Sequence, residues 1–401
     1  MTQETVNTEQ AFDKSVSHAP STPLLHLAMM LTGLATALLG PILPLLSSHN
    51  RLNLSDQQSG LLLLAQFCGS FSGGLTVSKY LRRSLVGGLA AGGIGFCVFG
   101  IATTLPIACV GLLIGGWGTG QVITAGNVVA GRRYSARRGS ALALLNFTWS
   151  FGAMLSPMLT AWLTPRFELR GLLLSFAGFH LIVLAGVLVQ LKGQAPEIAS
   201  NSDTGAGGES SLSLRLYIYF AALLFFYGGV ETCLSGWLTT FALRYGDKTL
   251  TISEYTTLVL WASLTVGRAI SSTLLLRVGE RALQRAGLVL TAICILALAN
   301  AHGGLAIAIF SIVLGMSLSP FFPATFSLLM QDRPSARQAG VVLCLSGLGA
   351  AILPSLMGVV STHSGSLQLA LAIPLAAAVI LLGMSLVPPS DPRSVAASPA
   401  A

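Results

Sequence analysis

Long apolar runs are the feature that most constrains what this chain can fold into. Runs of about 20 mainly apolar residues match the thickness of the hydrocarbon core of a bilayer. Of the 401 residues, 53% are hydrophobic and only 9% are charged, whereas roughly a quarter are charged in an ordinary soluble protein. The sequence predicts an all-α integral membrane protein with twelve transmembrane helices, near residues 24–47, 57–80, 84–104, 105–130, 139–163, 169–191, 215–241, 252–276, 282–300, 303–330, 338–361 and 366–387.

The apolar pattern is interrupted in the middle of the chain, and it is absent from both ends. The segment "KGQAPEIASNSDTGAGGESSLS" is rich in small and polar residues, as flexible linkers are. The first residues hold acids but no apolar core, which is unlike a signal peptide. The predicted division is a disordered cytoplasmic tail over 1–22, an N-terminal six-helix bundle over 23–191, a cytoplasmic linker over 192–213, a C-terminal six-helix bundle over 214–387 and a disordered cytoplasmic tail over 388–401.

The net charge of +8 could suggest nucleic acid, but the basic residues are spread over the predicted connections. If both termini are cytoplasmic, most of the Lys and Arg residues fall in the connections on the cytoplasmic side of the membrane. This is the positive-inside pattern. We therefore expect a monomeric multi-pass protein of the inner (plasma) membrane with both termini in the cytoplasm. Its partners would be the bilayer and a small molecule, not nucleic acid. The six cysteines form no C-x-x-C pair, so no metal site or cofactor is expected.

The two predicted bundles resemble each other in sequence. The segment "GSFSGGLTVSKYLRR" from Gly69 is echoed by "GRAISSTLLLRVGER" from Gly267, and "GAMLSP" from Gly152 is echoed by "GAAILP" from Gly349. Parallel repeats of this kind place a substrate site near the bilayer midplane where the halves meet, and they transport by alternating access.

The loop inside the first repeat resembles the loop signature of the major facilitator superfamily, G-x-x-x-D-R-x-G-R-R. Its Asp and its second Gly are replaced by Ser78 and Leu81. The resemblance implies the major facilitator fold, two pseudo-symmetric six-helix bundles, with a cytoplasmic gate that holds the outward-facing state. The alternative is that the basic residues only anchor topology by reaching the interface. The expected gate residues are Lys79, Arg83, Arg268, Arg277 and Arg281.

The stretch "FFYGGVETCLSGW" places one acid, Glu231, in the middle of a predicted span. The other acids among the 14 Asp and Glu residues fall in tails, loops or helix ends. Tyr227, Glu231, Ser235 and Thr239 recur at every fourth position, so they form one polar stripe that we expect to face the central cavity. Desolvation favours a neutral carboxyl, which predicts that Glu231 couples transport to a proton. The alternative is a structural pair with Arg268.

Amides and indoles lie at comparable depth in several predicted helices. Amides donate and accept hydrogen bonds, and flat aromatic rings pack on C–H faces, so together they suit a neutral polyhydroxylated ligand. The alternative is hydrogen bonding between helices, which polar residues in membrane bundles often perform. The predicted substrate-binding residues are Gln66, Gln121, Asn127, Asn146, Trp149, Tyr227, Glu231 and Trp261.

Tyr227, Gly229, Glu231 and Gly236 fit a Y-x-G-x-E…G pattern. The pattern resembles the seventh helix of the fucose–proton symporter group and of transporters like sodium-dependent glucose transporter 1. This resemblance implies secondary active transport of a hexose or deoxyhexose, not an enzymatic activity, with H⁺ or Na⁺ as the coupling ion. The chain departs from the group because it has no acids in the first and fourth helices, and Ala35 takes the place that corresponds to Glu231.

Two other functions stay open at this point. Drug/proton antiporters of the superfamily usually carry an Arg in helix 4, three residues before a Gly, and G-x-x-x-G-P in helix 5. Here Gly115 stands at the first position, and Ser156 precedes Pro157 at the second. A multidrug or metabolite efflux transporter of the same superfamily is therefore the alternative function. A non-transporting membrane sensor is less favoured because the linker and tails offer no signalling domain.

Overall fold

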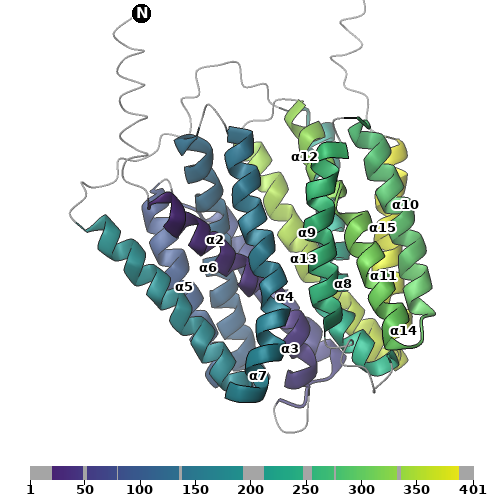
Figure 1. The fold of residues 1–401 in the computed structure, drawn as a ribbon, viewed down its shortest axis with the longest axis horizontal. Helices are drawn as coiled ribbons and strands as arrows, with labels where there is room; N and C mark the ends of the chain where they lie inside the picture. Colours follow the sequence, from purple (N-terminus) through teal and green to yellow (C-terminus); the bar gives the residue numbers. More distant parts are fainter. Residues whose placement is uncertain are drawn as a thin grey trace, which may run out of the picture. The chain divides into compact units, whose positions relative to one another are not determined.

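In the computed structural model, every regular element of the described residues is a helix (Figure 1). Nine helices in this described part are long and apolar enough to cross a membrane, so the predicted twelve spans stay a prediction. The described residues are 20–47, 52–78, 80–134, 138–192, 212–246, 255–274, 277–331 and 336–387.

The chain forms two compact units, Met1–Asn53 with Ala65–Ala206, and Leu54–Leu64 with Gly207–Ala401. The predicted division placed residues 54–64 in the N-terminal bundle, whereas the structure groups them with the second unit. Helix α4 (Asp56–Leu75) therefore begins in the second unit and ends in the first. The other helices of the first unit are α2 (Thr22–Ala37), α3 (Leu39–Leu46), α5 (Leu81–Ile101), α6 (Leu105–Arg133) and α7 (Arg138–Leu191).

The first predicted helix, 24–47, is divided into α2 and α3. The division follows from Pro41 and Pro44 in "LLGPILP", because a proline lacks the backbone N–H and its ring crowds the carbonyl four residues earlier. Conversely, the predicted helices 139–163 and 169–191 run together as α7. The junction lies at Glu168, whose φ of 54° and ψ of 171° are not helical, three residues after Pro165.

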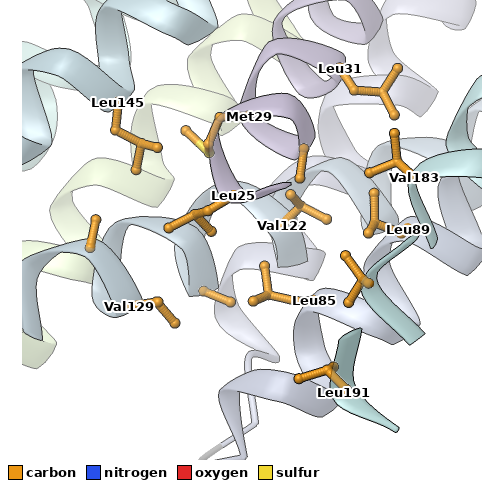
Figure 2. Close-up of a cluster of buried hydrophobic side chains, with 14 of the residues drawn as sticks. Leu25, Met29, Leu31, Leu85, Leu89, Val122, Val129, Leu145, Val183 and Leu191 are labelled. Carbon is orange, nitrogen blue, oxygen red and sulfur yellow. The ribbon is translucent and has the colours of Figure 1, made fainter. Parts of the chain in front are cut away.

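Leucine and valine side chains from α2, α5, α6 and α7 meet in the core of the first unit, as Figure 2 shows for Leu25, Leu85, Val122 and Val183. Small residues let α2 and α7 approach closely. A Cβ added at Gly152 would overlap the backbone carbonyl oxygen of Met30. Packing of this kind holds membrane helices together without a hydrophobic driving force between them.

The second unit repeats this packing with its own helices. A Cβ added at Gly349 would overlap the backbone carbonyl oxygen of Phe225, so the repeated glycine serves the same close crossing in both units. The predicted helix 303–330 is divided near Pro320, and 366–387 is divided at Leu371. The helices are α8 (Leu214–Tyr245), α9 (Thr256–Leu274), α10 (Glu280–Ala299), α11 (Gly304–Leu318), α12 (Phe321–Gln331), α13 (Ala336–Ser364), α14 (Leu367–Ala370) and α15 (Ala372–Leu386).

Candidate functional site

Glu231 of α8 forms an ion pair with Arg268 of α9. The Arg268 Nη2 atom donates to Glu231 Oε1 over 3.2 Å, and the Arg268 and Glu231 side chains are 23% and 15% exposed, respectively. A charge held away from water is costly unless it is paired, so the two residues explain each other's presence within helices of the second unit. Arg268 was predicted as a gate residue. Its observed partner is Glu231. A structural pair of these two residues was the alternative to proton coupling by Glu231.

Tyr227 lies next to this pair and packs against further aromatic side chains. The Tyr227 hydroxyl lies beside both charged groups. Its ring stacks on Phe321 of α12, with ring centroids 4.8 Å apart and planes 9° apart, and the Phe322 ring lies 6.3 Å away. The sequence analysis missed both phenylalanines. The signal that could have found them is the proline-interrupted segment "SPFFPATF", because interrupted helices in transporters often border binding sites.

The rest of the predicted stripe is packed inside the second unit. The hydroxyls of Thr239 and Thr257 lie 2.7 Å apart and share a hydrogen bond between α8 and α9, while Ser235 is buried. Trp261 is buried on α9, two turns before Arg268. The second unit thus brings together a carboxylate, a guanidinium, a phenol and aromatic rings, which can donate hydrogen bonds, accept them and pack on C–H surfaces.

In the first unit, the two glutamines predicted to bind substrate join helices. The Gln66 side-chain amide donates to the Ala35 carbonyl oxygen at 3.0 Å, just before the division between α2 and α3. The Gln121 amide donates to the Gly73 carbonyl oxygen and to Thr76 Oγ1, each at 3.0 Å. The amide groups therefore perform the interhelical hydrogen bonding that was the alternative to substrate binding. Their role as ligands stays a prediction.

The remaining predicted ligands of the first unit lie on α6 and α7. Asn127 donates to the Ile123 carbonyl oxygen at 2.8 Å, and Asn146 donates to the Leu142 carbonyl oxygen at 2.9 Å, in each case within its own helix. Trp149 is half-buried, and its backbone carbonyl oxygen faces Gly33 where α2 and α7 cross. These contacts neither bring the three side chains together nor assign them a ligand.

The predicted gate residues lie near helix ends. The Arg83 guanidinium lies 4.5 Å from the centroid of the Tyr80 ring at the start of α5, a favourable cation–π arrangement. Arg277 and Arg281 are exposed near the start of α10. Lys79 lies outside the described residues. Because the gate requires contacts between the two units, it stays a prediction.

Comparison with known proteins identifies the family. The family model of the Major Facilitator Superfamily matches residues 25–345. The chain belongs to the Major Facilitator Superfamily. It is therefore a multi-pass membrane transporter, and transporters of this superfamily bind small-molecule substrates within the membrane. No curated protein matches the sequence.

Solved structures of other transporters share the superfamily fold. A crystal structure of a mutant of the nucleoside transporter NupG matches with a TM-score of 0.72 and 13% identity, covering 90% of this chain and 98% of that one. A POT family transporter in complex with a thioalcohol conjugated peptide matches with a TM-score of 0.75 and 11% identity, covering 93% and 98%. A mutant of the E. coli fucose:proton symporter FucP matches with a TM-score of 0.63 and 19% identity, covering 91% and 97%. At these identities the likeness concerns the fold.

Proposed function

We propose that this superfamily member is a secondary active transporter of a small neutral polyhydroxylated solute, a hexose or deoxyhexose, which it carries by alternating access. The observation that carries the proposal is the Glu231–Arg268 ion pair beside Tyr227. A pair of opposite charges has no net charge, so a neutral solute can bind to it without leaving a charge uncompensated. Sugar hydroxyls both donate and accept, which suits a guanidinium, a carboxylate and a phenol at once.

Two further observations support a hydroxyl-rich ligand. Tyr227 adjoins the pair and its ring packs against Phe321 and Phe322, and aromatic rings pack well against the C–H faces of such molecules. Among solved structures with the same fold, one is a fucose:proton symporter and another is a nucleoside transporter. Both of those named solutes carry several hydroxyl groups.

We also propose that a proton drives transport through Glu231. A proton on this carboxyl removes its charge and weakens the ion pair, which frees the Arg268 guanidinium to donate hydrogen bonds to the solute. Proton binding and solute binding then favour each other, as linkage requires. The protein would perform this symport in the inner (plasma) membrane with both termini in the cytoplasm, the orientation that the positive-inside pattern favours.

The test is uptake of a panel of labelled sugars into proteoliposomes, with and without an inward proton or sodium gradient. We expect one hexose or deoxyhexose to accumulate when a proton gradient is imposed. Extrusion of lipophilic cations without uptake or exchange of any sugar would instead establish the efflux alternative. Accumulation driven by sodium alone would overturn the proton as the coupling ion.

Two variants separate coupling from binding. Glu231→Gln should abolish gradient-driven accumulation while sugar counterflow remains measurable, because the amide cannot carry the proton but can still donate and accept hydrogen bonds. The control is Glu9→Gln, which changes an acid outside the predicted spans and should leave accumulation unchanged. Normal accumulation by Glu231→Gln would remove Glu231 from the coupling mechanism.

A further inference from the structure

One carboxylate holds the first turn of α4 against α8 and α13. Asp56 accepts two hydrogen bonds from the Arg244 guanidinium, in the last turn of α8, one of them from Nη1 at 2.6 Å. It also accepts one from the Ser361 hydroxyl, near the end of α13. A guanidinium that donates two hydrogen bonds to one carboxylate combines charge with a fixed geometry. Asp56 therefore ties the start of α4 to the ends of two helices of the second unit.

The backbones of α4 and α13 meet at the same place. The Gln57 backbone N–H donates to the Thr362 hydroxyl oxygen at 2.8 Å. A Cβ added at Gly358 would overlap the Asp56 carbonyl oxygen. The start of α4 therefore lies at backbone distance from α13, as the helices at the crossing glycines do.

The rest of α4 is held by the first unit instead. Gln66 donates to the Ala35 carbonyl oxygen of α2, and Gln121 of α6 donates to the Gly73 carbonyl oxygen. The contacts accordingly group Leu54–Leu64 with the second unit and the remainder of α4 with the first. A helix that is divided in this way must lose one set of contacts when the two units move relative to each other, as alternating access requires.

The contacts of Asp56 are the ones that water can replace. The Arg244 side chain is 40% exposed, so both charged groups can be hydrated as they separate, and an exposed ion pair contributes little free energy. The Gln66 and Gln121 amides are buried, and their loss would leave buried carbonyl oxygens without these donors. The predicted topology places the linker before α8 in the cytoplasm, so the end of α8 with Arg244 lies on the outer side.

We propose that Asp56, Arg244 and Ser361 form an outer latch, which holds α4 closed against α8 and α13 and opens when the transporter faces outward. This role of the latch rests on the proposed alternating access, but not on the proposed solute or coupling ion. Leu63, two turns after Asp56, is 1% exposed, and its side chain lies against Gly236 of α8. Opening of the latch should therefore expose position 63 to the outside.

The test measures how fast Leu63→Cys reacts with a membrane-impermeant maleimide added outside intact cells. The full-length protein without this substitution gives the background from its six native cysteines. Asp56→Asn, added to Leu63→Cys, should raise the labelling rate about fivefold, the factor that corresponds to the loss of one exposed ion pair. Arg166→Gln is the control and should not change the rate. Arg166 also lies in a predicted outer connection, but its guanidinium contacts only Trp162, within its own turn, among the contacts found.

A double variant shows whether the two charged residues act as one latch. Arg244→Gln alone should also raise the labelling rate, and it keeps the proposal testable if Asp56→Asn does not reach the membrane. Asp56→Asn/Arg244→Gln should label about as fast as either single variant, because both remove the same contact.

Three results would overturn the latch. The first is labelling of both single variants at the rate of Leu63→Cys alone. The second is a double variant whose effect is the product of the two single effects, because the residues would then act separately. The third is equal acceleration by Arg166→Gln. Labelling requires no solute, so failure of the proposed sugar transport would leave all of these measurements readable.

Discussion

The two units share a glycine at a close helix crossing, but only the second has a charged pair at the matched positions compared below. Gly152 and Gly349 each allow a neighbouring helix to approach at backbone distance. The positions that hold Glu231 and Arg268 in the second unit correspond to Ala35 and Ser70 in the first. Ala35 is fully buried, and its carbonyl oxygen accepts the Gln66 amide. The repeated residues thus build the bundles, and the residues that differ carry the charge.

The shared glycines and the unshared charged pair have different physical reasons. A duplicated bundle needs its crossing glycines twice, since each copy must pack its own helices. A charged pair is not needed for that packing, because a pair removed from water is at best weakly stabilising. The asymmetry is consistent with the proposed role of Glu231, which lies in the second unit.

The largest expected effect on stability comes from breaking the pair. Arg268→Met removes the ion-pair partner of the Glu231 carboxylate. Removal of one partner of a buried pair costs about 3–5 kcal/mol of unfolding free energy. The double variant Glu231→Gln/Arg268→Met should regain most of that loss, because no unpaired charge remains. Both are measured by unfolding in mixed micelles.

The control for this prediction is the matched position of the first unit. Ser70→Ala should change the unfolding free energy by less than about 0.5 kcal/mol. If Arg268→Met were as stable as the wild type, the carboxylate would have another partner, and the comparison between the units would lose its main difference.

Part of this arrangement could be predicted from the sequence. The repeated glycines of "GAMLSP" and "GAAILP" indicated matched crossings, and the structure shows both. Pairing of Glu231 with Arg268 was one of two interpretations, because a charge within a span requires a partner. The partners of Gln66 and Gln121 could not be predicted, because both amides donate to backbone carbonyls. Every residue has a backbone carbonyl, so the sequence does not indicate which one accepts. Phe321 was missed because an apolar side chain beside a polar site looks like any core residue.

The second prediction tests whether the crossings are equivalent. Gly152→Ala and Gly349→Ala should each lower the unfolding free energy by roughly 1–3 kcal/mol, the usual effect of forcing an extra methyl group into close packing. The added Cβ would overlap a backbone oxygen in both cases, which cannot move as a flexible side chain can. The measurement is again unfolding in mixed micelles.

Each crossing variant has a control in its own unit. A Cβ at Gly178 or at Gly383 meets nothing within 4 Å, so Gly178→Ala and Gly383→Ala should be neutral or stabilising by up to about 1 kcal/mol, because alanine favours helix. A loss in only one of the two crossing variants would show that the units are not held together in the same way.

The third prediction concerns the division of the first helix, which α8 of the second unit does not have. Gln66→Leu removes the amide that donates to the Ala35 carbonyl oxygen at 3.0 Å and should cost about 1 kcal/mol, the net value of one such hydrogen bond. Asn300→Ala is the control, since Asn300 is exposed and its side-chain amide donates to the Leu296 carbonyl oxygen four residues earlier. If Gln66→Leu is as stable as the wild type but raises KM for the transported solute, Gln66 binds the solute and does not mainly connect helices.

The smallest expected effect concerns arginines that donate to backbone carbonyl oxygens at the ends of helices. Each unit places an arginine from near the start of one helix, α5 or α10, against the last turn of its final helix, α7 or α15. Arg285 donates to the Ser385 carbonyl oxygen from Nε and Nη2 at 3.2 and 2.7 Å, whereas Arg82 donates to the Leu191 carbonyl oxygen from Nη2 at 3.2 Å. A cation at a helix C-terminus contributes about 0.3–1 kcal/mol. Arg285→Gln and Arg82→Gln should therefore each cost less than about 1 kcal/mol.

Hydrogen exchange at the last turns of α15 and α7 measures the local stability of each helix end in these variants. Global unfolding is too insensitive for effects of this size. Arg285→Lys should retain the charge near the helix end but lose the two-atom donation that a planar guanidinium provides, so its exchange should lie between the wild type and Arg285→Gln. Equal exchange in Arg285→Lys and the wild type would mean that charge alone stabilises the end of α15. The planar guanidinium of Arg285 would then add nothing at this helix end beyond its charge, and this contact would no longer distinguish the two units.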